Sequence, residues 1–223
     1  IANTVKVMGG EDWKMWMDKL AEAGVLSEGA VTVAYSYIGP EVSKAMYRHG
    51  TIGKAKDDLE KTAHVIDADM KKIGGGAYVS VNKGLVTRAS AVIPIIPLYL
   101  AALFKVMKAA GSHEGCIEQM NRLFDSRLYG MPKGNGLAIA EKLGCKNDAL
   151  GISVDGENRI RIDDWELDDT IQSQVDKIMP NVTSENCAEL ADLAGYKHDF
   201  LATSGFDIAG VDYEADVERF DVI

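Results

Sequence analysis

The stretch AYSYIGPEVSKAMYRHGTIGKAK, residues 34–56, joins a strand-like segment to a helix-like one. The strand belongs to AVTVAYSYI, residues 30–38, which is rich in β-branched and aromatic residues and ends before Gly39-Pro40. From Thr51 to about Lys72, apolar residues recur every three or four positions, which predicts a helix. AYVSVN, residues 77–82, predicts a second strand that is apolar enough to be covered on both faces.

This order of strand, helix and strand decides the fold class. A crossover of this length normally joins two parallel strands and is right-handed. We therefore predict an α/β protein with a parallel sheet. The spacing of apolar residues predicts further helices at residues 11–23, 97–110, 114–128, 163–179 and 183–195. In GISVDGENRIRIDD, residues 151–164, a turn followed by alternating residues predicts a small hairpin.

Composition limits the classes of function. The chain has 223 residues, 47% of them hydrophobic, so one large domain or two small ones can bury a full core. The net charge of −10 argues against a nucleic-acid partner. The most apolar run, residues 89–104, is too short for a membrane span, and two prolines interrupt it. We expect a cytoplasmic protein whose three cysteines are free thiols.

Tyrosines and a lysine gather at the first strand-to-helix corner. Tyr35 and Tyr37 lie at the carboxyl end of the predicted strand, where parallel α/β sheets place their ligands, and Tyr47 and Lys56 follow. Residues nine apart on a straight helix point to opposite faces. Tyr47 and Lys56 can therefore share a site only if the backbone breaks near Gly50. We predict such a break, with Thr51 capping a new helix, Tyr47 in the turn before it and Lys56 in its second turn.

A tyrosine beside an ammonium suits hydride-transfer chemistry. The ammonium favours the phenolate, so the hydroxyl becomes a better donor to a developing oxyanion. The lysine can also donate to the hydroxyls of a ribose, while a cofactor supplies the electrons. The competing interpretation is packing, because this spacing also arises by chance and tyrosines at strand ends often pack.

Several longer motifs resemble those of a known family. They are YSYIGP at residues 35–40, the Tyr-x8-Lys spacing of Tyr47 and Lys56, residues 79–108, HEGCIEQM at 113–120, KVMGGEDW at 6–13, RIRIDDWEL at 159–167 and GFDIAGVDY at 205–213. Together they resemble the trans-2-enoyl-CoA reductases and the related enoyl-acyl-carrier-protein reductases. The resemblance implies a Rossmann-type sheet with additional helices, and NADH-dependent reduction of an enoyl thioester carried on coenzyme A or acyl-carrier protein.

The resemblance also implies roles for single residues. Tyr47 matches the catalytic tyrosine that donates to the thioester oxygen, and Lys56 matches the lysine that holds the nicotinamide ribose. Tyr37 matches a tyrosine that contacts the acyl substrate. Leu85, Val86 and Thr87 match a segment that contacts the cofactor. No metal site is expected. Two alternatives stay open at this point: a related Tyr–Lys enzyme that reduces a carbonyl, and a folded fragment without activity.

The chain departs from the family pattern in two ways. It shows no strand followed by the glycine-rich turn that binds the cofactor in the family. We therefore expect this chain to be the carboxyl-terminal half of a longer protein, whose NAD-binding half lies outside it. By the resemblance, the full-length protein is expected to be a monomer. The chain starts with Ile rather than Met, which agrees with its being part of a longer protein. Residues 130–151 look like a surface insertion.

Other motifs receive simpler interpretations. The acids of DDWEL, residues 163–167, predict a helix start, and the pair His113 and Cys116 predicts packing rather than a metal site. Residues 91–107 could form a core helix kinked by its prolines or a wall of an acyl pocket, and one helix could do both.

Overall fold

The protein is described here by a computed structural model that covers residues 1–128 and 141–216. The elements in chain order are α1 (Ala2–Met8), α2 (Glu11–Glu22), β1 (Val31–Ser36), α3 (Glu41–Lys44), α4 (Thr51–Met70), η1 (Lys71–Ile73), β2 (Gly76–Val81), η2 (Ser90–Val92), α5 (Ile96–Ala109), α6 (Cys116–Leu123), the π-helical turn η3 (Phe124–Leu128), β3 (Lys146–Asn147), β4 (Ser153–Val154), β5 (Arg159–Arg161), α8 (Asp169–Ile178), η4 (Met179–Asn181), α9 (Cys187–Leu190) and α10 (Leu193–Ala202).

A parallel sheet in the order β1-β2-β5 forms the centre of the fold. Strand β1 pairs with β2 from Val31 opposite Gly76 to Ser36 opposite Val81, and β5 pairs with the end of β2. The predicted α/β class with parallel strands is therefore confirmed. Every residue of β2 is buried, as expected for a strand with both faces covered.

The predicted hairpin at residues 151–164 is wrong. The turn itself forms, because Asn158 N donates to Asp155 O over 3.0 Å. One backbone bond joins the two sides of the turn, from Asp155 N to Arg159 O over 2.9 Å, but the pairing does not continue: β4 pairs with the short β3, and β5 joins β2 as a third parallel strand. This arrangement buries Ile160 in the core cluster that contains Tyr78 and Leu123, which a detached hairpin could not do.

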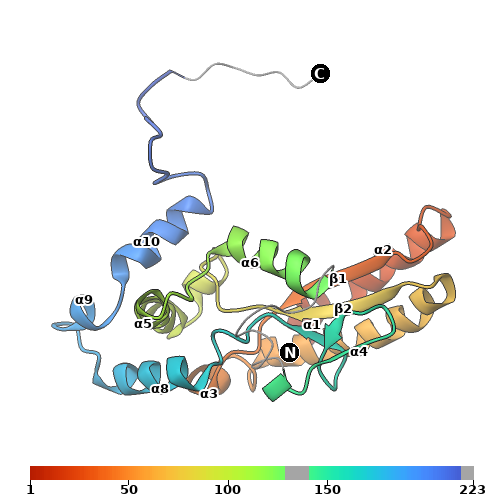
Figure 1. Cartoon of the computed structure of the whole chain (residues 1–223), viewed down its shortest axis with the longest axis horizontal. Coiled ribbons are helices and arrows are strands. Elements are labelled where there is room, and N and C mark those ends of the chain that lie inside the picture. Colours follow the sequence, from red (N-terminus) through yellow and green to blue (C-terminus); the bar gives the residue numbers. More distant parts are fainter. Residues whose placement is uncertain (129–140, 217–223) are drawn as a thin grey trace.

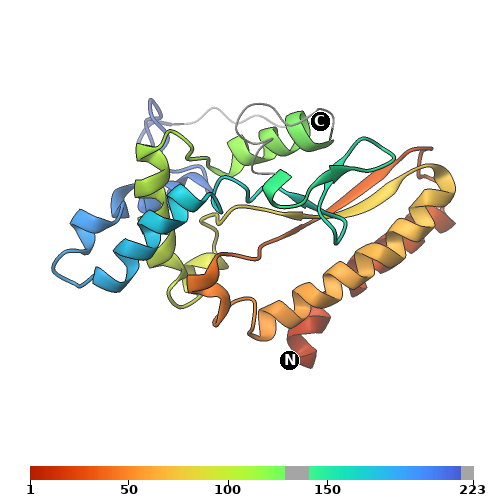
Figure 2. The ribbon, with the colours of Figure 1, turned by 60° about the horizontal axis from the view of Figure 1, so that its bottom comes forward.

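Helices cover both faces of the sheet (Figure 1). On one face, Ala77, Val79 and Val81 pack on α4 and α2. On the other face, Tyr78 and residues of β5 pack on α6. The two views agree that α4 and α6 lie on opposite sides of the strands (Figure 2).

The carboxyl end of each strand leads into a helical group. Strand β1 leads to α3, β2 leads to α5, and β5 leads to α8. Helix α5 is the centre of this group and is buried almost all round, in contact with α8 and α10. Its prolines do not kink it, because Pro94 precedes the helix and Pro97 lies in its first turn, where proline is tolerated. The core-helix interpretation of residues 91–107 is therefore confirmed without the kink.

Helix boundaries in the last third differ from the prediction. The helix expected at residue 163 begins only at Asp169, after the capping residue Asp168, because Asp163 and Asp164 are buried in ion pairs. The helix expected over residues 183–195 is two helices separated by an extended residue, Ala191. Helix α1 is an addition that the sequence analysis did not predict.

Three other expectations concern the chain as a whole. All three cysteines are free thiols, as predicted. Within the described ranges, no helix combines the length and the apolarity that crossing a membrane requires. Of the expected insertion at residues 130–151, positions up to 140 lie outside the described residues.

Candidate active site

The backbone breaks between Tyr47 and Lys56, as predicted. Helix α3 ends at Lys44, residues 45–49 form turns, and α4 begins at Thr51. Lys56 therefore lies in the second turn of α4 and Tyr47 in the turn that precedes it. The predicted cap is wrong in detail: Gly50 is the capping residue, its backbone is extended, and Thr51 makes no capping hydrogen bond.

Two glycines allow the turn to pack against the helix it precedes. Gly53 N donates to Tyr47 O over 3.1 Å. A Cβ atom at Gly53 would lie 1.7 Å from the carbonyl oxygen of Arg48, and one at Gly50 would lie 2.6 Å from that of Met46. Close backbone approach, rather than an unusual dihedral angle, explains why the sequence has glycine at both positions.

Tyr47 and Lys56 are both nearly buried, with 8% and 9% of their surface exposed. Burial raises the pKa of Tyr47, so the phenol stays protonated. This direction is opposite to the one expected from an adjacent ammonium. Burial lowers the pKa of Lys56, and the nearby Glu60 partly opposes that shift.

The ammonium of Lys56 has an unusual position. Among the described residues, its Nζ makes no hydrogen bond and no ion pair. Most of the side chain is buried, but the nitrogen is not among the side-chain atoms that are closed off from solvent without a partner, so it reaches the surface. The neighbouring charged groups are paired elsewhere: Glu60 accepts from Arg48 and Arg159, both over 3.4 Å. The ammonium of Lys56 thus has three N–H donors that make no hydrogen bond to the described residues.

Tyr37 and Tyr47 are in direct contact. Their ring centroids lie 5.1 Å apart at an interplanar angle of 76°, the edge-to-face arrangement that aromatic pairs prefer. Tyr37 lies one residue beyond the end of β1. Tyr35, by contrast, is 52% exposed and does not join this group.

A buried carboxylate connects Tyr37 to the segment that follows β2. Glu166 Oε1 accepts from the Tyr37 hydroxyl over 2.9 Å, and Oε2 accepts from Gly84 N over 2.6 Å. Leu85, Val86 and Thr87 follow Gly84 directly, so the structure brings this predicted cofactor segment next to Tyr37. The Thr87 side chain is exposed, and its Oγ1 accepts from Ser90 N.

The electrostatics of this group follow from burial. Burial raises the pKa of Tyr37 well above its ordinary value, and the charge of Glu166 adds to the shift. The pKa of Glu166 is raised by burial, while hydrogen bonds from Tyr99 and Gly84 oppose the shift. Burial lowers the pKa of Lys83, which lies beside Gly84 and donates to its carbonyl oxygen over 2.9 Å.

Sequence reasoning missed Glu166, Tyr99 and Lys83. Glu166 belongs to the acidic run that was interpreted as an exposed helix start, yet it is 0% exposed. Its partners lie just after β1, after β2 and on α5, far away in sequence, so no local spacing could have identified it. The alternation of acids with Ile162, Trp165 and Leu167 was the one available signal of a buried segment.

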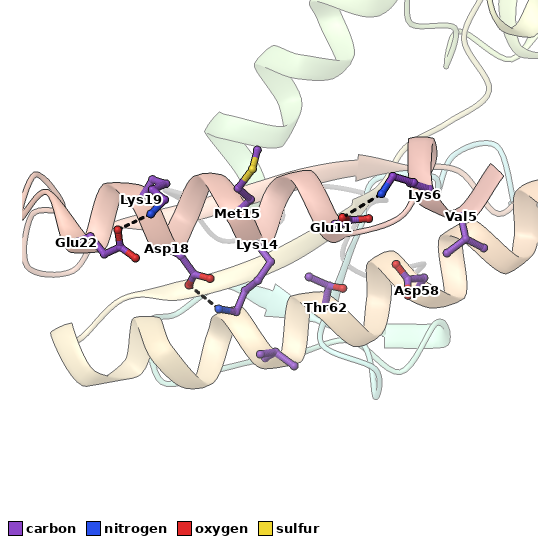
Figure 3. Close-up of a pocket in the computed structure, with 11 residues that line it drawn as sticks. Val5, Lys6, Glu11, Lys14, Met15, Asp18, Lys19, Glu22, Asp58 and Thr62 are labelled. Carbon is purple, nitrogen blue, oxygen red and sulfur yellow. Dashed lines mark hydrogen bonds and ion pairs between the residues drawn. The ribbon is translucent and has the colours of Figure 1, made fainter. Parts of the chain in front are cut away.

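Two pockets of the described chain do not include Tyr47 or Lys56. A groove of about 600 Å³ lies between α1–α2 and α4 (Figure 3). Its lysines are paired with acids on the same surface, such as Lys14 with Asp18 and Lys19 with Glu22, which is typical of a solvated groove. A second pocket, of about 700 Å³, lies between α6 and α10 and is lined by His113, Cys116 and Asp199, and also by Leu85 and Val86 of the predicted cofactor segment.

Of the pair that was predicted to pack, His113 does so, whereas Cys116 is exposed. The His113 ring lies edge-on to Phe104 with centroids 4.5 Å apart. Burial lowers its pKa to about 4, helped by the positive charges of Lys83 and Lys108. Within residues 1–128 and 141–216, no cluster of His, Cys, Asp and Glu is large enough to hold a metal ion.

Comparison with known proteins places the chain in a family. Residues 1–129, more than half of the chain, match the family model described as "Trans-2-enoyl-CoA reductase catalytic region". The chain belongs to the trans-2-enoyl-CoA reductase family. Residues 154–217 match a second model, described as "Enoyl reductase FAD binding domain".

Individual relatives of the trans-2-enoyl-CoA reductase family agree. The chain is 59% identical over 222 residues to a protein of Treponema denticola named "Trans-2-enoyl-CoA reductase [NADH]". It is 55% identical over 219 residues to a protein of Cytophaga hutchinsonii named "Enoyl-[acyl-carrier-protein] reductase [NADH]". These matches cover 100% and 98% of this chain but 51% of each relative, so the chain spans about half their length. The first match also includes residues 130–151.

Solved structures of family members match the fold. The crystal structure of Treponema denticola trans-2-enoyl-CoA reductase in complex with NAD superposes with a TM-score of 0.84 at 58% identity, covering all of this chain and 51% of that one. The Clostridium acetobutulicum enzyme in complex with NADH also gives 0.84, at 46% identity, covering 96% of this chain and 50% of that one.

Proposed function

We propose that the protein to which this chain belongs reduces the trans-2 double bond of enoyl thioesters with NADH, as a step of fatty acid synthesis. The observation that carries the proposal is the corner itself: a buried, protonated Tyr47 in ring contact with Tyr37, followed by the largely buried Lys56, whose ammonium makes no hydrogen bond within the described chain. The names of the relatives and the complexes with NAD and NADH support it.

Each group of the corner has a role in this proposal. The Tyr47 hydroxyl donates a hydrogen bond to the thioester oxygen and stabilises the enolate that forms when the hydride is added. The α-carbon of this enolate then takes up a proton from solvent, which completes the saturated thioester. The raised pKa of Tyr47 keeps its proton in place while the substrate oxygen becomes negative. Tyr37, fixed against the Tyr47 ring, contacts the acyl part of the substrate. NADH supplies the hydride that is added to the β-carbon.

The residues present fit the nicotinamide end of NADH. The unpartnered Nζ of Lys56 can donate to the ribose hydroxyls, which would satisfy a cation that the described chain leaves without a hydrogen bond. Leu85, Val86 and Thr87 lie at the carboxyl end of β2, where parallel sheets bind their ligands. The Thr87 hydroxyl accepts one hydrogen bond and keeps its own proton for a phosphate or ribose oxygen.

A flavin does not fit the residues that match the second family model. The buried charged side chains of that segment are satisfied by protein partners: Arg161 binds Asp163, and Asp164 accepts from both Arg122 and Arg127. Among the described residues of that segment, the cations without an ion pair are exposed lysines, Lys177 and Lys197, and no buried cation is left for a flavin pyrophosphate. No step of the proposal involves a flavin.

We also infer that the chain is the carboxyl-terminal half of a Rossmann-type domain. The relatives are about twice as long, and the glycine-rich turn that binds the cofactor pyrophosphate would lie in their other half. The chain alone should then bind NADH weakly and turn over little. A cytoplasmic location and a monomeric full-length protein belong to the same proposal.

The test compares two substrates. The chain is joined to the part of the Treponema denticola relative that it does not match, and NADH oxidation is measured with crotonyl-CoA and with acetoacetyl-CoA. The proposal predicts turnover of crotonyl-CoA. Turnover of acetoacetyl-CoA instead would establish a carbonyl reductase. An absence of turnover in the joined protein, together with tight NADH binding by the isolated chain, would contradict the half-domain assignment.

A further inference from the structure

The Glu166 carboxylate joins three elements of the candidate site. Its Oε1 accepts from the Tyr37 hydroxyl, after β1, and from the Tyr99 hydroxyl, on α5, over 2.9 Å and 2.6 Å. Its Oε2 accepts from Gly84 N, after β2, over 2.6 Å. The residue is 0% exposed, so these are the buried, charge-assisted bonds that position side chains most firmly.

The direction of each hydrogen bond is fixed by the partners. Gly84 N–H can only donate. Tyr99 also donates to Glu166, because an ionised carboxylate can only accept, and the Tyr99 oxygen in turn accepts from Gln172 Nε2 over 3.2 Å. The same Gln172 nitrogen donates to the backbone oxygen of Glu166 over 2.6 Å, which holds the carboxylate in place from behind.

The space around the carboxylate is fitted to it. A Cβ atom at Gly84 would lie 2.7 Å from Leu100 Cδ2 and 3.5 Å from Glu166 Oε1. Glycine at this position therefore lets the backbone amide reach the carboxylate. The buried cation of Lys83 lies near enough to stabilise the negative charge electrostatically.

We propose that Glu166 is a positioning residue for this reaction, which fixes the substrate-contacting Tyr37 relative to the cofactor-contacting loop of residues 84–87. The two carboxylate oxygens act on the two binding regions separately. Oε1 accepts from the Tyr37 hydroxyl and so fixes the position of Tyr37 and the direction of its O–H bond, and Oε2 accepts from Gly84 N and so holds the loop. This inference rests on the proposed function, because it takes the roles of Tyr37 and of the loop from it.

Two substitutions separate the two oxygens. In Glu166→Gln, the amide oxygen must face Gly84 N–H, so the loop keeps its bond, while the NH2 group faces the phenols and reverses the hydrogen bond to Tyr37. Glu166→Ala removes both bonds. Tyr99→Phe is the matched control, because it deletes the third partner of the same carboxylate and leaves Tyr37 and Gly84 bound.

The measurements are kcat and the KM values for crotonyl-CoA and NADH in the joined protein. Glu166→Gln should lower kcat/KM for crotonyl-CoA about tenfold or more, the loss expected for a hydrogen bond to a charged group, and leave KM for NADH nearly unchanged. Glu166→Ala should also raise KM for NADH. In a Tyr37→Phe background, Glu166→Gln should add little to the loss with crotonyl-CoA.

Hydrogen exchange gives a readout that does not depend on activity. Amides of residues 84–87 should exchange faster in Glu166→Ala than in Glu166→Gln or Tyr99→Phe. If the joined protein reduces acetoacetyl-CoA rather than crotonyl-CoA, the proposed function fails, and the same KM comparison with acetoacetyl-CoA still decides the role of Glu166. If neither substrate is reduced, the exchange rates decide it. The proposal is overturned if every variant lowers the melting temperature equally while KM values and loop exchange stay at wild-type levels.

Discussion

The backbone N–H of Gly53, in the first turn of α4, donates to the carbonyl oxygen of Tyr47 over 3.1 Å. This bond fastens the turn that carries Tyr47 to the helix that carries Lys56. It requires glycine, because a Cβ atom at residue 53 would overlap the Arg48 carbonyl at 1.7 Å. The geometry of the proposed catalytic pair thus depends on a position that makes no side-chain contact.

Gly53→Ala should therefore displace the Tyr47 turn. We expect a loss of about 1–3 kcal/mol in the free energy of unfolding, the cost of forcing extra atoms into a packed site, together with a loss of turnover. Denaturant unfolding and kcat measure the two effects. Lys54→Ala is the control, since residue 54 is exposed on the same turn and should cost less than about 0.5 kcal/mol. Unchanged stability in Gly53→Ala would show that the turn can relax.

The substitution Tyr47→Phe tests whether the Tyr47 hydroxyl is the donor to the thioester oxygen. The variant keeps the ring contact with Tyr37 and removes the hydroxyl, so kcat should fall by about 10²–10⁴, the range for loss of a positioned proton donor. Binding of NADH, measured by fluorescence titration, should be nearly unchanged. Tyr35→Phe is the matched control because Tyr35 is exposed and lies outside the group. Equal turnover of Tyr47→Phe and the unmodified protein would remove Tyr47 from its role.

Local chemistry explains what could be predicted from the sequence. The parallel strands and the crossover helix follow from short-range patterns of apolar residues. The break before α4 follows from the need of Tyr47 and Lys56 to share a corner and from the glycine between them. The predicted role of Gly50 was nevertheless incorrect. Gly50 has an ordinary extended backbone, and glycine is needed there because the backbone passes close to the Met46 carbonyl oxygen.

Long-range partners explain what could not be predicted. Strand β5 looked like half of a hairpin because its alternation is visible, whereas the free edge of β2 that attracts it is not. Asp164 and Glu166 looked like the acids of a helix start, because nothing near them in the sequence indicates that they are buried. The groups that satisfy them, Arg122, Arg127 and Tyr37, are tens of positions away or more. A buried acid cannot be distinguished from an exposed one until the groups that satisfy it are known.

The buried ion pairs of Asp164 should contribute strongly to the free energy of unfolding. Asp164 is 0% exposed and accepts from Arg122 Nη1 over 2.7 Å and from Arg127 Nη2 over 2.6 Å. Asp164→Ala should destabilise the protein by about 3–5 kcal/mol, because it leaves two guanidinium groups short of a buried partner. Glu22→Ala, which breaks the exposed pair with Lys19, should cost no more than about 1 kcal/mol. Similar losses in both variants would contradict the distinction between buried and exposed pairs.

His113 should make stability depend on pH below neutrality. Its pKa is lowered to about 4 from the ordinary 6.5, by burial and by Lys83 and Lys108, while Asp192 opposes the shift. A lowered pKa means that the unfolded state takes up the proton first. The stabilisation is therefore complete above pH 6.5 and is lost as the pH falls towards 4, by an amount of up to about 3 kcal/mol.

The measurement is the free energy of unfolding between these two pH values. His113→Gln removes the titrating ring and should flatten this part of the profile. His64→Gln, at an exposed position on α4, should leave the slope as it is. The interpretation is wrong if the two variants give the same slope as the unmodified protein.

Strand β1 should make the isolated chain associate. Among the described residues, β1 pairs only with β2, which leaves its other edge unpaired. On one face of the same strand, Val31, Val33 and Tyr35 line an apolar pocket of about 230 Å³. Because the relatives are about twice as long, we expect a strand from their other half to cover this edge. Without that half, an unpaired apolar edge should recruit a second copy.

Sedimentation of the isolated chain should accordingly show oligomers that grow with concentration, and addition of the missing half of the Treponema denticola relative should dissolve them. Tyr35→Lys places a charge on the edge and should shift the chain towards monomer. Met46→Lys is the matched control: residue 46 is 48% exposed, close to the 52% of Tyr35, but lies in the turn before α4. If Met46→Lys dissociates the chain equally well, the added charge rather than the β1 edge governs association, and the half-domain assignment loses this support.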